Sequence, residues 1–227
     1  YPQTLSGLGA CNLAAWLAHG MLARRDIPVT LVAELGMAGY SPRPCDPYLF
    51  NFRNLATCSL AGGARTGLGL MVGGATAHCL GSLGAGQVDA RGRFNSTRLG
   101  DGTLLVGSGG ANDVASAAEE VVLTLPSGRQ RLVETLPYVT GPGERVTAVV
   151  TELGVLEKDR GGGALRLTRL VGPLAGGSRE AHVEALRGRC GFPIEAPGDL
   201  PLVPDAGPED VARLRLFDPE RAFLGPE

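Results

Sequence analysis

Hydrophobic and polar positions follow two different periods in the first 34 residues. Residues 10–25 combine good helix formers with apolar side chains at helical spacing and end in two arginines, so a helix is predicted there. An Asp-Ile-Pro segment interrupts this pattern. Residues 29–33 are apolar on both faces, as expected of a buried strand in a parallel sheet. Glu34 is therefore predicted at the carboxyl end of a buried strand, which is where ligands bind in open α/β sheets.

The rest of the pattern predicts short elements separated by glycine and proline. Residues 35–54 hold three prolines and no sustained period, and a long irregular loop is expected there. Hairpins are predicted over residues 88–96, turning at Arg91-Gly92, and around Pro126–Gly128. The other predicted strands are 80–85, 104–106, 120–125, 130–135, 145–151 and 165–171, and the other predicted helices are 112–120, 179–187 and 208–217. This order predicts an α/β fold with an open, mostly parallel sheet flanked by helices and additional β-hairpins, in a single domain over residues 1–227.

Composition supports a globular chain and excludes two classes of partner. With 227 residues and 44% hydrophobic content, the chain can bury roughly 70 to 75% of the surface that it exposes when unfolded. Its 21 basic and 23 acidic residues are scattered and give a net charge of -2, so neither nucleic acid nor an anionic membrane is expected to bind. The apolar runs are shorter than a bilayer span requires.

The cysteines indicate a reducing environment. They are five in number, widely spaced and without a CxxC pair, which argues against a disulfide framework and against a structural zinc site. Reduced, buried thiols and a cytoplasmic location are therefore expected. Because the chain starts at Tyr1 rather than at Met, a further N-terminal segment is expected to precede it.

Two stretches concentrate polar groups beside flexible backbone. In the first, Glu34 ends an apolar run before Gly36, and such a carboxylate can act as a nucleophile, as a general base or only as a cap for loop amides. The second is the glycine loop, Gly107-Ser108-Gly109-Gly110. It lacks the lysine of a P-loop, so its better use is to bring backbone amides close to a developing oxyanion.

Other reactive residue types offer weaker signals. The three histidines have no ligand spacing, and no metal site is predicted. Ser108 has no His and Asp at the spacing of a recognisable triad. Cys45 and Cys58 flank aromatic and basic residues, as a reactive thiol could, but nothing indicates a lowered thiol pKa. Both are expected to be buried and to take no part in a reaction.

An ordered set of motifs resembles the beta subunit of glutaconate CoA-transferase, a family I CoA-transferase. The resemblance covers most of the chain, and the set is specific whereas its single pieces are not. The motifs are VAELG (32–36) with SP (41–42), GQVD (86–89) with Gly92 and NST (95–97), GSGGAN (107–112), YVT (138–140), VTELGVL (150–156) and DPERAF (218–223).

The resemblance implies a fold, a reaction and a set of site residues. The fold would be that of CoA-transferases, of the NagB/RpiA-like type. Glu34 would attack an acyl-CoA and become a glutamyl-CoA thioester, and the amides of Gly109 and Gly110 would stabilise the oxyanion. Coenzyme A would be a substrate with no permanently bound cofactor, and the contacts with it would come from Gly36, Ser108, Ala111 and Asn112.

The same resemblance implies partners and leaves alternatives open. An alpha subunit would complete the enzyme in a heterodimer, a heterotetramer or a larger assembly, acting on an acyl-CoA and a small carboxylic acid of glutaconate or 3-oxoacid type. The segment before Glu34 is longer than in the glutaconate enzyme and the loop after it differs, so the exchanged acids are not identified. The alternatives are a CoA-dependent hydrolase or decarboxylase on the same scaffold, and a non-catalytic CoA-binding subunit.

Overall fold

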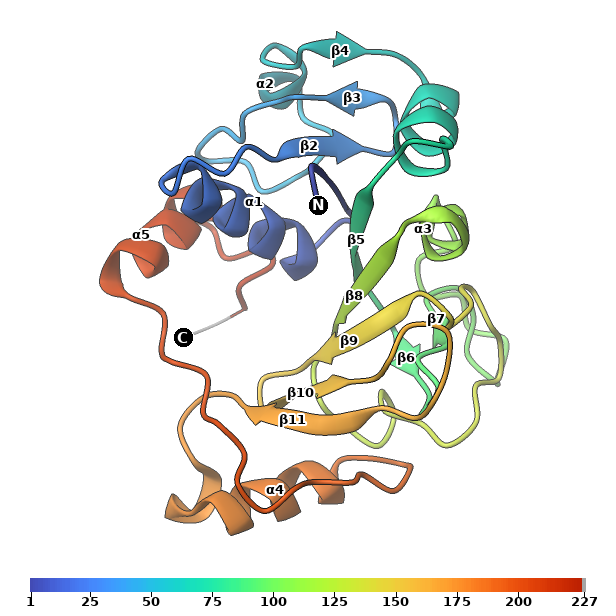
Figure 1. Cartoon of the computed structure of the whole chain (residues 1–227), viewed down its shortest axis with the longest axis vertical. Coiled ribbons are helices and arrows are strands. Elements are labelled where there is room, and N and C mark those ends of the chain that lie inside the picture. Colours follow the sequence, from blue (N-terminus) through green and yellow to red (C-terminus); the bar gives the residue numbers. More distant parts are fainter. Residues whose placement is uncertain (226–227) are drawn as a thin grey trace. The chain divides into compact units, whose positions relative to one another are not determined.

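The computed structural model describes residues 1–225 and divides the chain into two compact units (Figure 1). Unit 1 comprises Tyr1–Gly84, Ala117–Glu119 and the segment from Ala206 to the C-terminal end. Unit 2 comprises Ala85–Ser116 and Glu120–Asp205. The chain therefore passes between the units more than once. That residues 1–227 form one domain stays a prediction.

Unit 1 is built around a mixed sheet in the strand order β5-β1-β2-β3-β4. β1 pairs in parallel with both β2 and β5, whereas β3 is antiparallel to both β2 and β4. The central strands are buried, as a parallel pair covered by a helix should be. The strands are β1 Gln3–Ser6, β2 Thr30–Ala33, β3 Met37–Ala38, β4 Leu60–Ala61 and β5 Cys79–Gly84.

Helices of unit 1 cover this sheet and join its strands. α1 connects β1 to the parallel strand β2 and packs against β1, β5 and α5. α5 begins at a proline, which suits the first helical position because its missing N–H would have no partner there. The helices are α1 Ala10–Ala23, α2 Phe52–Leu55, the π-helix η1 Arg65–Val72 and α5 Pro208–Phe217.

The core of unit 1 centres on one buried tryptophan. Trp16 of α1 is 1% exposed and packs edge-to-face against Tyr40 and Phe217, with ring centroids 6.5 and 5.4 Å away. Its indole N–H donates to the Tyr40 hydroxyl at 3.1 Å. Burial raises the pKa of Tyr40 to about 12, so this hydroxyl is neutral at ordinary pH.

Unit 2 contains a smaller mixed sheet in the order β8-β9-β10-β11 and a separate β6-β7 hairpin. β8 and β9 are parallel, and β10 is antiparallel to both β9 and β11. α4 packs against β11, and its N-cap residue Ser178 accepts a hydrogen bond from the amide of Ala181. The elements are β6 Gln87–Val88, β7 Phe94–Asn95, α3 Ala111–Ala117, β8 Glu120–Thr124, β9 Val146–Val150, β10 Gly154–Glu157, β11 Arg166–Leu170, η2 Ala175–Gly177 and α4 Arg179–Gly188.

These elements confirm the predicted α/β fold with an open sheet flanked by helices and an additional hairpin. The helix predicted at residues 10–25 spans Ala10–Ala23, the strand predicted at 29–33 spans Thr30–Ala33, and the predicted turn at Arg91-Gly92 joins β6 to β7. The sheet of each unit is mixed, with the parallel pairs on one side and antiparallel strands on the other.

Three local predictions were wrong. Residues 130–135 form isolated bridges from Leu132 to Val88 and Cys190 and no strand, because β8 pairs in parallel with β9 and forms no hairpin at Pro126–Gly128. Residues 104–106 contribute one bridge, at Leu104. The strands predicted at 145–151 and 165–171 are confirmed as β9 and β11, and β10 between them was not predicted.

The loop prediction for residues 35–54 also needs correction at both ends. Met37–Ala38 is a strand, β3, and Phe52–Leu55 is a short helix, α2. Side-chain hydrogen bonds hold the segment between them: Asn12 donates to the Pro47 carbonyl at 3.0 Å, and Asn54 donates to the Leu49 carbonyl at 3.2 Å. Side chains of buried asparagines thus make the hydrogen bonds to this loop's backbone that neighbouring strands would make in a sheet.

Replacing Tyr40 with phenylalanine should lower the free energy of unfolding by about 1 to 3 kcal/mol, because the buried indole N–H of Trp16 would lose its acceptor. Urea unfolding followed by tryptophan fluorescence measures the change. Tyr138→Phe is the matched control, since Tyr138 is 39% exposed, and it should change stability by less than about 0.5 kcal/mol. Equal effects of the two substitutions would contradict the role given to the Trp16–Tyr40 bond.

The five cysteines, all free, should react with DTNB in two classes. The prediction that all five thiols are buried was wrong for Cys45, which is exposed, and for Cys58, which is partly exposed. Both should therefore react in the folded protein. Cys11, Cys79 and Cys190 are buried, and burial raises the pKa of each thiol, to about 11 for the first two. These three should react only after unfolding in denaturant. Absorbance traces with and without denaturant count both classes, and fast reaction of more than two thiols in the folded protein would contradict the burial.

Candidate functional site

Glu34 opens the tight turn that joins β2 to β3 in unit 1. Ala33 pairs with Met37 across the two strands, so only three residues form the turn. The amide of Gly36 donates to the Ala33 carbonyl at 2.9 Å, and Gly36 has a φ of 95°. A three-residue hairpin requires such a glycine in the left-handed region. The turn places the Glu34 side chain, which is half-buried, directly at the end of a buried strand.

Glycines pack around the backbone of this turn. A β-carbon on Gly36 would lie 2.4 Å from the Gly63 carbonyl oxygen, and one on Gly67 would lie 2.8 Å from the Glu34 carbonyl oxygen. The amide of Gly62 donates to the Gly36 carbonyl at 2.9 Å. Gly67 belongs to the π-helix η1, a type of helix that occurs often at functional sites. The turn is therefore held on one side by backbone atoms that leave no room for a side chain.

The glycine loop of unit 2 leads into α3. Gly107 and Gly109 both have positive φ values, 97° and 49°, and a β-carbon on Gly107 would meet no atom within 4 Å. The Ser108 hydroxyl donates to Asn112 Oδ1 at 2.5 Å, and the Ala111 amide donates to the Ser108 carbonyl at 3.0 Å. Within the described residues, the amide of Gly109 donates to no protein acceptor. It is therefore available to an oxygen atom from outside the chain.

The predicted site residues fall in different units. Glu34 and Gly36 lie in unit 1, whereas the loop that holds Ser108, Gly109 and Gly110 lies in unit 2. Ala111 and Asn112 begin α3 beside that loop. The structure thus brings the predicted oxyanion and CoA residues of the loop together, and the approach of Glu34 to them stays a prediction.

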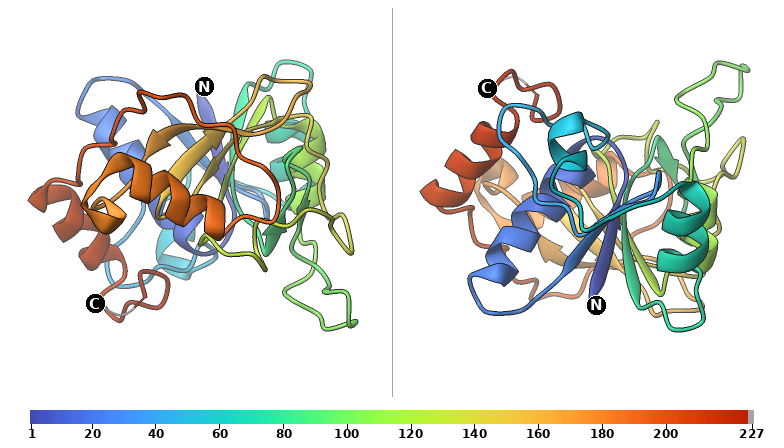
Figure 2. Two further views of the ribbon diagram at one scale, coloured as in Figure 1. Left: turned by 90° about the horizontal axis from the view of Figure 1, so that it is seen from below. Right: turned by 90° about the horizontal axis from the view of Figure 1, so that it is seen from above.

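The segment before the glycine loop is an exposed extension of unit 2. Leu104 is 73% exposed and Val106 is 88% exposed. Figure 2 shows the surrounding stretch, coloured light green, as a long loop that stands away from the strands of its own unit. Large apolar side chains exposed on a protruding loop are typical of a surface that a partner covers.

The histidines, for which the sequence predicted no metal site, include two that contact other groups of the protein. His182 is fully buried; its Nδ1 accepts from the Ala175 amide at 2.9 Å, and its Nε2 lies 2.7 Å from the Leu153 carbonyl. His78 lies 2.7 Å from Glu119. The described residues contain no group of three or more His, Cys, Asp or Glu side chains that could hold a metal ion. No helix among them is long and apolar enough to cross a membrane.

Sequence reasoning did not find the contribution of Gly62, Gly63 and Gly67. The available signal was a GG pair followed four residues later by another glycine, but the chain contains 35 glycines and such spacings arise by chance. Their role depends on which backbone they contact, and the contact crosses about 30 residues of chain. Only the fold reveals it.

Comparison with known proteins finds relatives among the CoA-transferases. No model of a protein family matches the chain. The beta subunit of 3-oxoadipate CoA-transferase from Pseudomonas knackmussii is 31% identical over 110 residues, which cover 40% of this chain and 42% of that protein. The beta subunit of glutaconate CoA-transferase from Acidaminococcus fermentans is 32% identical over 97 residues, covering 34% and 36%. The matches thus span less than half the length of these curated relatives.

The fold is similar to that of solved enzymes along the whole chain. Glutaconate coenzyme A-transferase from Acidaminococcus fermentans superposes with a TM-score of 0.81 at 22% identity, over 100% of this chain and 92% of that one. The decarboxylase AibA/AibB gives a TM-score of 0.77 at 23% identity, over 97% and 89%. At such identities a structural likeness establishes the fold alone.

The chain therefore has a CoA-transferase fold. It is a distant relative of the beta subunits of family I CoA-transferases, and the resemblance seen in its ordered motifs is confirmed.

Gly67→Ala should lower the free energy of unfolding by about 1 to 3 kcal/mol, because the new β-carbon would press against the Glu34 carbonyl oxygen and the turn would have to shift. Gly69→Ala is the matched control in the same π-helix, since a β-carbon there meets only the Arg65 side chain, at 3.9 Å. Denaturant unfolding of the two variants measures the difference. If Gly69→Ala destabilised the protein as much as Gly67→Ala, the packing described for the turn would be wrong.

Proposed function

We propose that this chain is the beta subunit of a heteromeric CoA-transferase that moves CoA between an acyl-CoA and a carboxylic acid. The observation that carries the proposal is the position of Glu34: a half-buried carboxylate at the carboxyl end of a buried strand, in a turn whose backbone is fixed by glycines. The relatives among the CoA-transferase beta subunits agree with it. A nucleophile that must become covalently attached needs such a fixed position.

In the proposed reaction, Glu34 is the nucleophile. A carboxylate oxygen of Glu34 attacks the carbonyl carbon of the acyl-CoA, the C–S bond breaks, and CoA leaves as a thiolate while an acyl-glutamyl anhydride forms. The thiolate then attacks the glutamyl carbonyl and releases the first acid as a carboxylate. The resulting glutamyl-CoA thioester passes its CoA to the second acid by the reverse steps. No atom is gained or lost overall, and covalent catalysis splits one difficult exchange into easier steps.

Each attack creates a tetrahedral oxyanion, and the glycine loop supplies amides that could stabilise it. The amides of Gly109 and Gly110 are the proposed donors, and the Gly109 amide donates to no protein acceptor within the described residues. Loss of one oxyanion donor typically raises the barrier by about 2.7 to 4 kcal/mol. The proposal requires Glu34 of unit 1 and this loop of unit 2 to meet around the substrate.

The proposed ligands and partner follow from the same reaction. CoA is a substrate and not a resident cofactor, and it would contact Gly36, Ser108, Ala111 and Asn112. An alpha subunit would complete the enzyme, and the exposed side chains of Leu104 and Val106 are suited to such a partner. The cytoplasmic location expected from the reduced thiols stays a prediction.

A second candidate is a CoA-dependent decarboxylase or hydrolase. The likeness to the decarboxylase AibA/AibB, with a TM-score of 0.77, favours it specifically, because one scaffold serves both reactions. Glu34 would then act as a general base on a CoA-bound substrate and would form no covalent adduct. Turnover of an acyl-CoA without an acceptor acid separates this candidate from a transferase.

Glu34→Gln should abolish CoA transfer in the complex with the alpha subunit, with a loss of at least about a thousandfold in kcat, because the amide cannot form the anhydride. Glu220→Gln, which removes an exposed carboxylate of the same unit, should keep full activity. Wild-type complex incubated with acyl-CoA and then with hydroxylamine should gain a hydroxamate at Glu34 in peptide mass spectra, and the Glu34→Gln complex should not.

Three results would count against the proposal. Full activity of the Glu34→Gln complex would show that Glu34 is not the nucleophile. Turnover with no hydroxamate at Glu34 and no need for an acceptor acid would favour the decarboxylase or hydrolase. A complex that binds CoA but processes no member of an acyl-CoA panel would indicate a non-catalytic CoA-binding subunit.

A further inference from the structure

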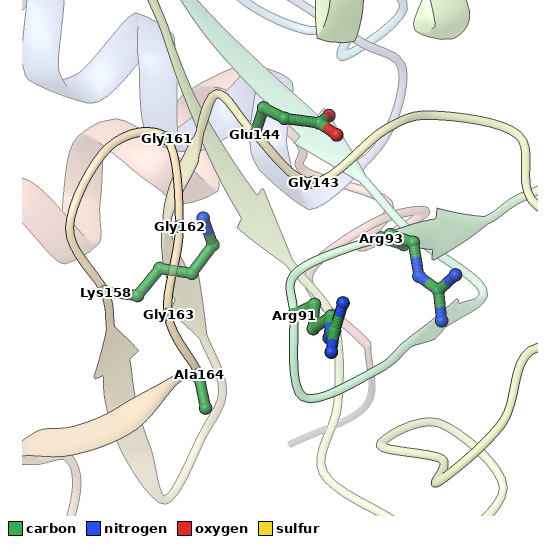
Figure 3. A pocket seen from close by; sticks show the side chains of 9 residues that line it. All are labelled: Arg91, Arg93, Gly143, Glu144, Lys158, Gly161, Gly162, Gly163 and Ala164. Atoms are coloured by element: carbon green, nitrogen blue, oxygen red, sulfur yellow. The ribbon is translucent and has the colours of Figure 1, made fainter.

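Unit 2 contains an open pocket of about 650 Å³ that the proposed reaction does not use. Its walls come from the β6-β7 turn, from the segment before β9 and from the loop between β10 and β11 (Figure 3). Basic side chains and glycines dominate the lining, with one acidic side chain. The lining residues are Arg91, Arg93, Gly143, Glu144, Lys158, Gly161, Gly162, Gly163 and Ala164.

The wall formed by the β6-β7 turn is rigid. Asp89, which is 2% exposed, accepts from the amides of Arg91 and Arg93 at 2.9 and 3.0 Å and from Arg93 Nε at 2.7 Å. A β-carbon on Gly143 would lie 2.4 Å from the Arg91 carbonyl oxygen, so the segment before β9 packs directly on this turn. Arg93 is neutralised by Asp89, whereas Arg91 is exposed and keeps its charge.

Lys158 is a buried cation that points into this pocket. It is the chain's single lysine and is 6% exposed. A β-carbon on Gly92 would lie 3.2 Å from Lys158 Cε, so the aliphatic part of the side chain packs against the β6-β7 turn. In Figure 3 its nitrogen points toward the segment of Gly143 and Glu144. Within the described residues, the ammonium group makes no hydrogen bond and no ion pair within 4 Å. Such a cation is costly to bury without a partner.

The electrostatic surroundings do not remove that cost. Glu144 and Asp159 attract the charge of Lys158, but desolvation outweighs them and lowers its pKa. The loop that follows Lys158 offers space: β-carbons on Gly161, Gly162 and Gly163 would meet nothing within 4 Å. A ligand can therefore approach the loop backbone closely while it faces the ammonium group.

The amides of Gly161 and Gly162 donate to the carbonyls of Glu144 and Asp159 at 2.9 and 3.4 Å, and within the described residues no such bond is made by the amide of Gly163. We propose that this pocket binds the phosphate group of a small molecule, held between Lys158, Arg91 and the backbone amide of Gly163. A phosphate monoester presents three terminal oxygens in different directions, and these match an ammonium group, a guanidinium group and the Gly163 amide. A carboxylate has only two oxygens in one plane and would leave one wall unpaired. This inference is independent of the proposed role of Glu34.

Isothermal titration of the full chain with inorganic phosphate tests the proposal. Wild-type protein should bind phosphate saturably, and Lys158→Met and Arg91→Gln should each weaken binding at least about tenfold. Arg179→Gln removes the same charge from α4, whose first residue does not line the pocket, and should bind as the wild type does. Lys158→Met should also unfold at a temperature no lower than the wild type in phosphate-free buffer, because the buried ammonium group has no hydrogen bond to lose.

Competition identifies the source of the phosphate. If CoA displaces inorganic phosphate and dephospho-CoA does not, the 3′-phosphate of CoA occupies the pocket; if neither displaces it, the phosphate belongs to another metabolite. Both results support the pocket. Absence of saturable binding in the wild type, or equal binding by wild type and Arg91→Gln, would overturn the proposal. So would an equal loss in Arg179→Gln, since this would indicate screening by net charge alone.

Discussion

The tightest packing around the candidate nucleophile is between backbones. The turn that begins at Glu34 lies against Gly63 and Gly67, at distances that exclude a β-carbon from Gly36 and from Gly67. Side chains can adopt other rotamers when they are crowded, but a backbone in such contact cannot move without its neighbours. The direction in which Glu34 leaves the sheet is thus set by the π-helix as much as by β2.

Much of unit 1 could be predicted because its signals are local. The period of apolar residues in α1, the break before β2 and the unbroken apolar run of β2 each appear within one short window. Glu34 was placed correctly at the end of that run for the same reason. The hairpin that follows was not predicted, because β3 has only two residues. Its turn depends on the positive φ of Gly36, which in the sequence resembles any other loop glycine.

The strand pairing of unit 2 was harder to predict, because β8 pairs with a strand that lies far away in the sequence. Residues around Leu132 have the composition of a strand and follow a clear turn signal, yet β8 pairs with β9, more than twenty residues away. β10 is a short strand of four residues between two longer candidates. Composition indicates where a strand can form, but the choice of neighbour is a competition between alternative pairings of similar local quality. The glycine loop could be singled out nonetheless, because its glycines and polar side chains lie next to one another in the sequence.

The burial of Lys158 has a consequence beyond ligand binding. The described surface carries many arginines but no accessible ammonium side chain, since the chain's single lysine is 6% exposed. Acetylation, ubiquitination and other modifications of lysine side chains therefore have one position available in this sequence, and folding closes it. Arginine keeps the surface charged while removing the group on which those enzymes act. Within the described residues, the folded chain thus offers almost no lysine surface to such enzymes.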